Sequence, residues 1–330
     1  MQLKSDPAGR GASGPRRKPK KGKTVQLIEY GVVLSLLFLV RLTPLGLIRR
    51  FSKVLGSLFF RLVKKRRLIA LNNLSAALGK ERDEVELRDI ARESFASFFL
   101  TYFEIAKFQS LMKNPGSVER LVEDPDDVRR IFEKAKGFHD AWKGCIFVTP
   151  HIGNWEMLPH VSAAVGIPLV IVARPLDNVY LERVLYRDRA GSGQVIIPKR
   201  NALFVLQKTL QDGKSIGMLP DQSTMQGISV PYFGRNAFTT PVPAILSALY
   251  KRPLVVVACC RNRKTGKFEG VVSDPILPGE YKSEKEEIHR LTELMNRTME
   301  DVVRKYPEQY LWMHNRWKTY TGRRARPAGA

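Results

Sequence analysis

The sequence predicts an α/β fold, with a mixed, largely parallel sheet flanked by helices and a membrane helix near the N-terminus. Three observations indicate this. Short apolar runs alternate with helical segments from about residue 145 onwards. The 330 residues are 44% hydrophobic, which suffices for a substantial core. An apolar run of nearly bilayer-spanning length precedes this region.

The expected strands are short and apolar, and helical patterns follow most of them. The strands are expected at residues 145–149, 168–173, 194–197, 215–219, 253–260 and 267–273. The helices are expected at residues 82–107, 154–166, 178–190, 201–213, 241–251 and 283–306. There is no glycine-rich dinucleotide motif and no Walker lysine motif, so a nucleotide-binding fold is not indicated.

Most of the basic charge lies at the N-terminal end. The net charge is +23, and residues 1–67 carry 17 Lys and Arg against two acids, so that segment alone contributes +15. A basic excess suits anionic lipid, nucleic acid or an acidic protein partner, and charge alone does not choose among them. We expect residues 1–24 to be a disordered basic tail and residues 323–330 a second disordered tail.

The apolar run Tyr30–Ile48 is a marginal membrane span. Its 19 residues would reach about 28 Å as a helix, close to the roughly 30 Å of a bilayer core. Arg41 and Pro44 interrupt it, so whether it crosses the bilayer or lies in its interface stays open. We expect residues 25–70 to form a membrane-anchoring helical region and residues 71–322 the α/β domain.

The segment after this run has the pattern of an interfacial helix. Apolar residues recur at helical spacing, with Lys and Arg between them. They are Phe51, Val54, Leu55, Leu58, Phe59 and Leu62. A helix packed on a soluble core would show the same pattern, but the adjoining apolar run and the basic clusters favour an anionic membrane surface.

The three cysteines are expected to be core residues. Cys145, Cys259 and Cys260 have neither disulfide-framework nor metal-ligand spacing, which indicates a reducing compartment. Cys259 and Cys260 are neighbours on one strand and should point to opposite faces of it.

The stretch FVTPHIGNWEML carries the first candidate site. His151 follows an expected strand, Asn154 is a suitable helix N-cap, and Glu156 falls in the first helical turn. A histidine oriented by a carboxylate is the usual general-base arrangement. Alternatives are a structural histidine and a zinc site. Zinc would need His139 or His160 at spacings that match no known motif, so we expect no metal.

Other candidates lie at strand ends and near the C-terminus. Asp221 and Gln222 directly follow an expected strand. Thr239 and Thr240 are expected to cap the next helix. The aromatic and basic residues near the C-terminus suit either the core or a membrane-facing belt. These are Trp312, His314, Arg316 and Trp317.

Several co-linear blocks resemble the lipid A biosynthesis lauroyl/myristoyl acyltransferases, within the wider lysophospholipid acyltransferase superfamily. They are RRLIALNNLSAAL with ARESF, HIGNWE, ARPLDN with YRDRAGSG, GMLPDQSTMQGISVPYFGRNAFTT and YLWMHNRWKT. Together they cover about residues 25–320. The resemblance implies a glycerolphosphate-acyltransferase-like fold and an inner-membrane enzyme with its active site on the cytoplasmic face.

The resemblance also implies a reaction. An acyl chain would pass from acyl carrier protein to a hydroxyl of a lipid A precursor, with His151 as base and Glu156 orienting it. No cofactor is implied beyond the acyl thioester. Substrate binding would fall to residues of the matching blocks, with a cation or N–H donor at the oxyanion. They are Arg174, Asn178, Arg187, Asp221 and Gln222. Among the arginines, Arg187 and Arg189 are weaker candidates, for a phosphate contact of the acceptor.

Other functions compete with this interpretation. The acceptor could instead be a lysophospholipid or a phosphoinositide mannoside. A membrane-bound hydrolase could use the same His and Glu to activate water. A nucleic-acid-binding protein would need charge and aromatics on one folded face, whereas here the charge adjoins an apolar run, so we expect no nucleic-acid partner.

Overall fold

The computed structural model describes residues 22–111, 125–173, 178–181, 195–198 and 202–320. It confirms a mixed α/β fold built on a six-stranded sheet with the order β3-β2-β4-β1-β7-β8. Every neighbouring pair is parallel except β7 and β8. The strands are β1 Ile146–Val148, β2 Leu169–Ala173, β3 Val195–Pro198, β4 Ser215–Met218, β7 Leu254–Arg261 and β8 Phe268–Val272.

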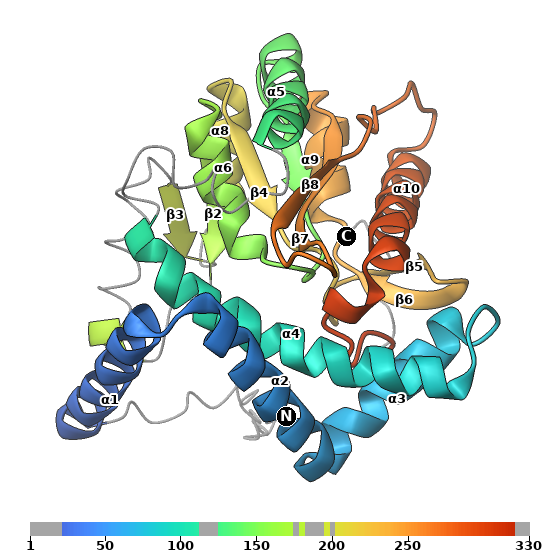
Figure 1. Ribbon diagram of the computed structural model, residues 1–330. Helices are drawn as coiled ribbons and strands as arrows, with labels where there is room; N and C mark the ends of the chain where they lie inside the picture. Colours follow the sequence, from blue (N-terminus) through green and yellow to red (C-terminus); the bar gives the residue numbers. More distant parts are fainter. Residues whose placement is uncertain (1–21, 112–124, 174–177, 182–194, 199–201, 321–330) are drawn as a thin grey trace, which may run out of the picture.

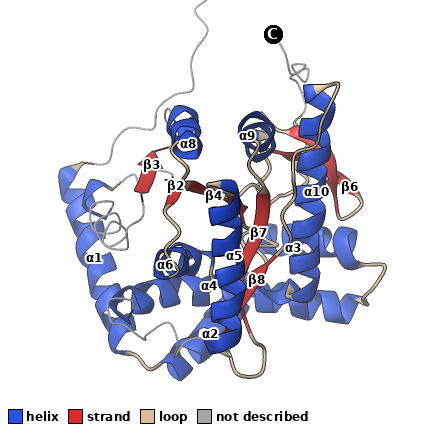
Figure 2. Ribbon diagram, turned by 90° about the horizontal axis from the view of Figure 1, so that it is seen from above, coloured by secondary structure: helices blue, strands red, loops and turns tan. Residues whose placement is uncertain are grey.

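Helices cover both faces of this sheet (Figure 2). One face carries α8, α9 and α10, and the other carries α5 and α6. Their bounds are α5 Pro125–Trp142, α6 Leu158–Ala164, α8 Ala202–Gln211, α9 Val242–Tyr250 and α10 Glu284–Lys305. The strands and helices expected from alternating apolar runs are thus confirmed, except that the helix expected at 178–190 lies largely outside the described residues.

The strand β7 shows why the sheet needs a cover on both sides. All eight of its residues are buried, and alternate residues enter different cores. Cys260 packs with the α9 and α10 core, whereas Cys259 packs with the α5 and α6 core. The cysteines therefore lie on opposite faces of the strand, as predicted, and Cys145 is equally buried. Burial raises the pKa of Cys145 to about 12.

A β-hairpin was not expected from the sequence. β5 (Ile228–Tyr232) and β6 (Arg235–Thr239) pair in antiparallel register and form a separate two-stranded sheet. The turn between them has positive φ at Phe233 and Gly234. Pro231 and polar residues interrupt the apolar alternation of this segment, so its sequence does not show the pattern of a strand pair.

Four helices form the described N-terminal stretch, residues 22–111 (Figure 1). They are α1 Lys23–Leu42, α2 Leu45–Leu62, α3 Lys64–Leu78 and α4 Glu84–Leu111. Helix α4 crosses the edge of the sheet at which the parallel strands end, and α1 and α2 pack on its outer side.

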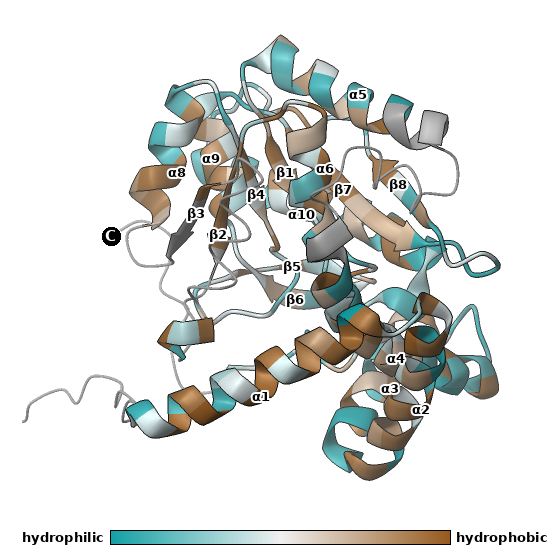
Figure 3. Ribbon diagram, turned by 60° about the vertical axis from the view of Figure 1, so that its left-hand side comes forward, coloured by the Kyte–Doolittle hydropathy of each residue, from teal (hydrophilic) through white to brown (hydrophobic). Residues whose placement is uncertain are grey.

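The apolar run expected as one helix over Tyr30–Ile48 is divided between α1 and α2. Pro44 immediately precedes α2, where its missing N–H costs no hydrogen bond. The backbone N–H of Thr43 closes α1 on Leu39. By length and composition alone, α1 is long and apolar enough to cross a membrane. Figure 3 shows it at the edge of the body, with hydrophobic residues along much of its length.

The expected boundary between the anchoring region and the α/β domain falls within a continuous helix. The boundary between residues 70 and 71 falls inside α3. Both Ala70 and Leu74 belong to the main core, which is the one that the sheet forms with α8, α9 and α10. Residues 1–21 and 321–330 lie outside the described residues, and Lys23 already begins α1. The division into an anchoring region and an enzyme domain stays a prediction.

Candidate active site

The site lies where two adjacent strands of the sheet end. His151 follows the central strand β1, and Asp221 follows β4. Since β1 and β4 are parallel neighbours, residues 70 positions apart in the chain meet at one edge. The backbone N–H of Thr149 donates to the carbonyl of Met218 at 3.1 Å, which keeps the two chains in register beyond the last strand residues.

His151 and Asp221 make two hydrogen bonds. The ring Nδ1 of His151 lies 2.6 Å from Oδ1, and the backbone N–H of His151 donates to Oδ2 at 2.8 Å. Asp221 is 2% exposed, while the side chain of His151 is 18% exposed. The carboxylate accepts a hydrogen bond from Nδ1–H, so in the neutral ring it is Nε2 that carries no proton. The side-chain amide nitrogen of Gln222 lies 3.3 Å from that Nε2.

The electrostatics of the pair favour an imidazolium beside a carboxylate. Burial alone lowers the pKa of His151, but the charge and hydrogen bond of Asp221, with a smaller effect of Glu156, raise it overall. Burial likewise raises the pKa of Asp221, yet His151 and the charge of Arg316 bring it below its usual value. The pair can therefore stabilise a proton that Nε2 takes up.

Glu156 is not the residue that contacts Nδ1. It lies in the short 3-10 helix η1 (Trp155–Met157), half-buried, and acts on His151 through its charge. The same charge contributes to the raised pKa of Tyr102, after burial. The orienting position expected for Glu156 is taken by Asp221. The role of Glu156 in the reaction stays a prediction.

Asn154 does not cap the helix through its side chain. The side chain makes no capping hydrogen bond and instead donates to Glu104 of α4 at 3.0 Å. Thr239 also differs from expectation. Its hydroxyl oxygen accepts hydrogen bonds from the side chains of Arg316 and Asn296 and does not cap α9. Thr240 accepts a long hydrogen bond of 3.5 Å from the backbone N–H of Val242, near the start of α9.

The C-terminal segment, residues 306–320 after α10, forms hydrogen bonds with the loop that follows β1 and with the loop that follows β4. The backbone N–H of Leu311 donates to the carbonyl of His151 at 3.0 Å, and that of Ser223 donates to Nε2 of His314 at 3.2 Å. Asn73 of α3 donates to the carbonyls of both Trp312 and His314. This segment therefore belongs to the core and the site rather than to a membrane-facing belt. Trp312, Arg316 and Trp317 are all buried.

Asn178 is held by α1. Its side-chain nitrogen donates to the carbonyl of Gln26 at 2.8 Å and to Glu29 at 3.3 Å, and its oxygen accepts the backbone N–H of Tyr180. Its expected role in substrate binding stays a prediction. The other predicted cations, Arg174, Arg187 and Arg189, lie outside the described residues. Among the described residues, no group of three or more His, Cys, Asp or Glu could hold a metal.

Comparison with known proteins decides the family. A model of the bacterial lipid A biosynthesis acyltransferase family matches residues 17–319. The chain belongs to this family. It is an acyltransferase of lipid A or a related glycolipid, and the resemblance expected from its sequence blocks is confirmed.

The relatives are distant but extensive. The lipid A biosynthesis palmitoleoyltransferase of Escherichia coli is 27% identical over 272 residues, covering 80% of this chain and 83% of that one. The lipid A biosynthesis lauroyltransferase of E. coli is 23% identical over 290 residues, covering 87% and 90%. A phosphatidylinositol mannoside acyltransferase of Mycolicibacterium smegmatis is 26% identical over 194 residues, covering 57% and 60%.

Proposed function

We propose that this protein is a membrane-bound O-acyltransferase that moves a fatty acyl chain from acyl carrier protein to a hydroxyl of a lipid A precursor. The observation that carries the proposal is the orientation of His151 by Asp221 at the sheet edge. It leaves Nε2 as the proton acceptor in a side chain that is still partly exposed. Membership of the family supports the acyl transfer itself.

The proposed reaction begins with proton removal. Nε2 of His151 takes the proton of the acceptor hydroxyl as its oxygen attacks the carbonyl carbon of the acyl thioester. The new C–O bond forms, the C–S bond breaks, and the leaving thiolate takes the proton back from Nε2. Asp221 stabilises the imidazolium between these two transfers, as its charge and hydrogen bond favour the protonated ring.

Two polar side chains adjoin the reacting atoms. The side-chain amide nitrogen of Gln222 lies next to Nε2 of His151. When the acceptor hydroxyl takes up the position beside Nε2, this amide can donate a hydrogen bond to the oxygen of that hydroxyl. Glu156 adds a second negative charge near the imidazolium. Arg174 is retained from the sequence as the cation for the developing oxyanion, with Arg187 as a phosphate contact of the acceptor.

The N-terminal helices support attachment to an anionic membrane. Helices α1 and α2 carry many large hydrophobic side chains that are exposed. On α1 these are Val25, Leu27, Ile28, Val32, Leu36, Phe38, Leu39 and Leu42, and on α2 they are Leu47, Phe51, Val54, Leu58 and Leu62. Arg50, Lys53 and Arg61 lie among those of α2, as suits anionic headgroups. We place the active site at the cytoplasmic face of the inner membrane.

The acceptor can be tested directly. The purified protein with acyl carrier protein thioester and a lipid A precursor should yield a product heavier by one acyl chain, measured by mass spectrometry. Acylation of a phosphoinositide mannoside or a lysophospholipid instead would move the proposal to another acceptor. Release of free fatty acid without any acylated lipid would identify a hydrolase and refute acyl transfer.

The base can be tested separately from the acceptor. His151→Ala should lower turnover by more than roughly 10²-fold, because it removes the only group proposed to take the proton. The matched control is His289→Ala, since His289 is an exposed residue of α10 and should be replaceable without loss. Near-normal acyl transfer by a folded His151→Ala protein would refute the assignment.

A further inference from the structure

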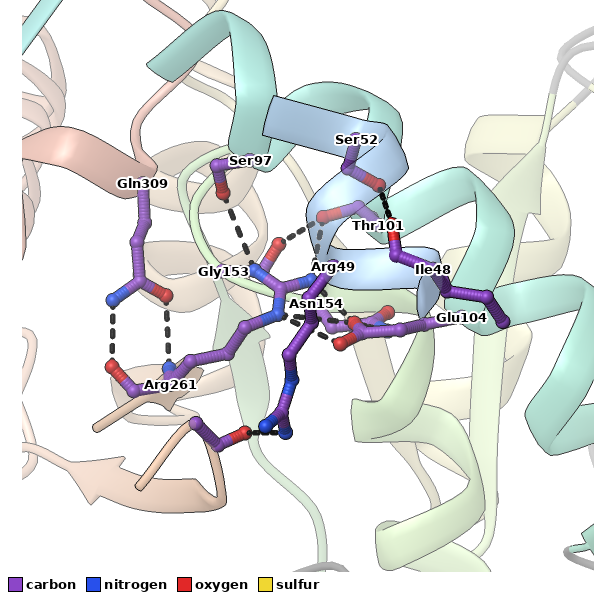
Figure 4. Close-up of polar contacts among 11 residues, drawn as sticks. Ile48, Arg49, Ser52, Ser97, Thr101, Glu104, Gly153, Asn154, Arg261 and Gln309 are labelled. Carbon is purple, nitrogen blue, oxygen red and sulfur yellow. Dashed lines mark hydrogen bonds and ion pairs between the residues drawn. The ribbon is translucent and has the colours of Figure 1, made fainter. Parts of the chain in front are cut away.

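A buried ion pair lies behind the turn that carries His151. Glu104 of α4 is 1% exposed and Arg261 at the end of β7 is 6% exposed. Nε of Arg261 lies 3.0 Å from both carboxylate oxygens, and Nη2 donates to Oε2 as well. Figure 4 shows the pair at the centre of a group of polar side chains from α4, β7 and the C-terminal segment.

Such a pair needs a reason beyond stability. The cost of removing two charges from water is often as large as their attraction, so apolar residues of equal size would serve a core as well. The contacts around this pair indicate what it is for. Oε2 of Glu104 accepts the side-chain amide of Asn154 at 3.0 Å. Nη2 of Arg261 donates at 2.9 Å to the hydroxyl of Thr101, which in turn donates to the carbonyl of Gly153 at 2.7 Å.

Asn154 and Gly153 belong to the turn that begins at His151. The backbone N–H of Gly153 donates to the carbonyl of Gln309 at 3.2 Å, and that of Asn154 donates to Cys259 at 2.8 Å. The side-chain amide of Gln309 also makes two hydrogen bonds of 2.8 Å with the backbone of Arg261. Its oxygen accepts from the N–H of Arg261, and its nitrogen donates to the carbonyl of Arg261. The ion pair and the turn therefore share the same partners.

There is no spare room in this turn. Gly153 has a φ of +58°, and a Cβ there would lie 2.1 Å from the carbonyl oxygen of Cys259. With its N–H bonded to the C-terminal segment, the carbonyl of Gly153 is the group that faces α4. Thr101 is thus the contact through which the ion pair reaches the backbone of the turn.

We infer that the Glu104–Arg261 pair, acting through Thr101 and Asn154, is a positioning device that fixes the turn 151–154 and so holds the imidazole of His151 against Asp221. The inference rests on the proposed function, because it takes His151 as the base. These four residues touch no reacting atom and act through the backbone of the turn. Helix α4 also packs on α1 and α2. The position of the turn is therefore linked, through α4, to the helices that are proposed to meet the membrane.

Removing one hydroxyl tests this most gently. Thr101→Val keeps the shape of the side chain and leaves Arg261 bonded to Glu104, but it leaves the carbonyl of Gly153 without its donor. A displaced base loses alignment with both the acceptor hydroxyl and Asp221. We expect kcat to fall about 10- to 100-fold with KM for both substrates little changed. Thr101→Ser restores the hydroxyl and should recover most of the activity.

The pH profile separates positioning from mere stability. Two charges raise the pKa of His151, that of Asp221 after β4 and that of Glu156 in η1. His314 of the C-terminal segment is also near, since the charge of His151 contributes to lowering the pKa of His314. Asp221 is the one that raises the pKa of His151 most, and burial opposes it. If the turn shifts, the contact with Asp221 weakens, and the acid limb of kcat/KM should move to lower pH. A smaller folded fraction would lower the rate without moving that limb.

A matched control exists in α10. Thr292 is also 0% exposed and also helical, and its hydroxyl donates to the carbonyl of Ile288 in its own helix. The Thr292→Val protein should lose about as much thermal stability as the Thr101→Val protein. It should keep the wild-type kcat and the wild-type position of the acid limb of kcat/KM. If Thr101→Val behaves like this control, or if Thr101→Ser is equally impaired, the positioning role is overturned.

A second variant covers the case in which Thr101→Val does not fold. Asn154→Ala removes one donor to Glu104 and leaves the ion pair intact. It should show the same fall in kcat and the same shift of the acid limb, and a wild-type profile would overturn the inference. A wild-type protein without acyl transfer would instead refute the proposed function, so the two failures are distinguishable.

Discussion

Replacing Asp221 with asparagine tests the pairing at the centre of the site. In the wild-type protein both carboxylate oxygens accept, one from Nδ1–H of His151 and one from its backbone N–H. Asparagine has the same shape but offers one acceptor and one donor. Two donors of His151 therefore compete for a single oxygen.

Each orientation of the asparagine has its own cost. If its nitrogen faces Nδ1, the ring must carry its proton on Nε2 and can no longer accept one from a hydroxyl. If its nitrogen faces the backbone N–H, two buried donors oppose each other, which costs about 1–3 kcal/mol of folding stability. The first orientation avoids that conflict, so we expect the inactive tautomer to dominate.

The expected loss is roughly 10²- to 10⁴-fold in kcat, equivalent to about 3–5 kcal/mol in the activation barrier. The remaining activity should have its acid limb at lower pH. The reason is that the pKa of His151 is raised by Asp221 against the effect of burial, and loss of that charge leaves burial to dominate. A neutral base is required, so a lower pKa extends activity towards acid.

The assay is steady-state acyl transfer across a pH series, with thermal unfolding measured on the same preparations. Asp212→Asn is the control, since Asp212 is an exposed residue paired with Lys208. A folded Asp221→Asn protein with near-wild-type kcat and an unmoved acid limb would refute the role of Asp221.

Three further predictions concern the surroundings of the site. Glu156→Gln should shift the acid limb to lower pH by less than Asp221→Asn, because its charge is the smaller effect on His151; an equal or larger shift would contradict this ranking. Gly153→Ala should unfold at a clearly lower temperature than Gly234→Ala: both pay about 1–3 kcal/mol for positive φ, but only Gly153 also lacks space for a Cβ. Removing residues 1–21 should weaken binding to anionic vesicles at low salt and matter little at high salt, by sedimentation.

The alternation of apolar runs and helices was enough to predict the sheet and its covering helices. It could not reveal the hairpin β5–β6, whose strands carry Pro231 and exposed polar residues. Nor could it place the break at Pro44 as a boundary between two helices, although it identified Pro44 as an interruption. Hydropathy reports burial along the chain, whereas a boundary depends on which backbone groups find partners.

The sequence places His151 and Asp221 at strand ends, but it does not pair them. It pairs His151 with Glu156 instead, because a strand end and the helical turn that follows it can face each other across the bend, and because HIGNWE resembles the family motif. Strand order decides the matter, since β4 lies next to β1. Asn154 was expected to be a cap because short motifs describe local contacts. Its partner Glu104 is 50 residues away, and nothing in the spacing of α4 distinguishes it from a surface acid.

The grip of Asn73 on the carbonyls of Trp312 and His314 has a practical consequence. A water-soluble version of this enzyme would commonly be sought by deleting its N-terminal helices. Here such a deletion would remove Phe60 and Leu74 from the main core and free the segment that braces His151. Solubility is better sought by replacing outward-facing side chains such as Val54 and Leu62, which are 66% and 68% exposed, while the full chain is retained.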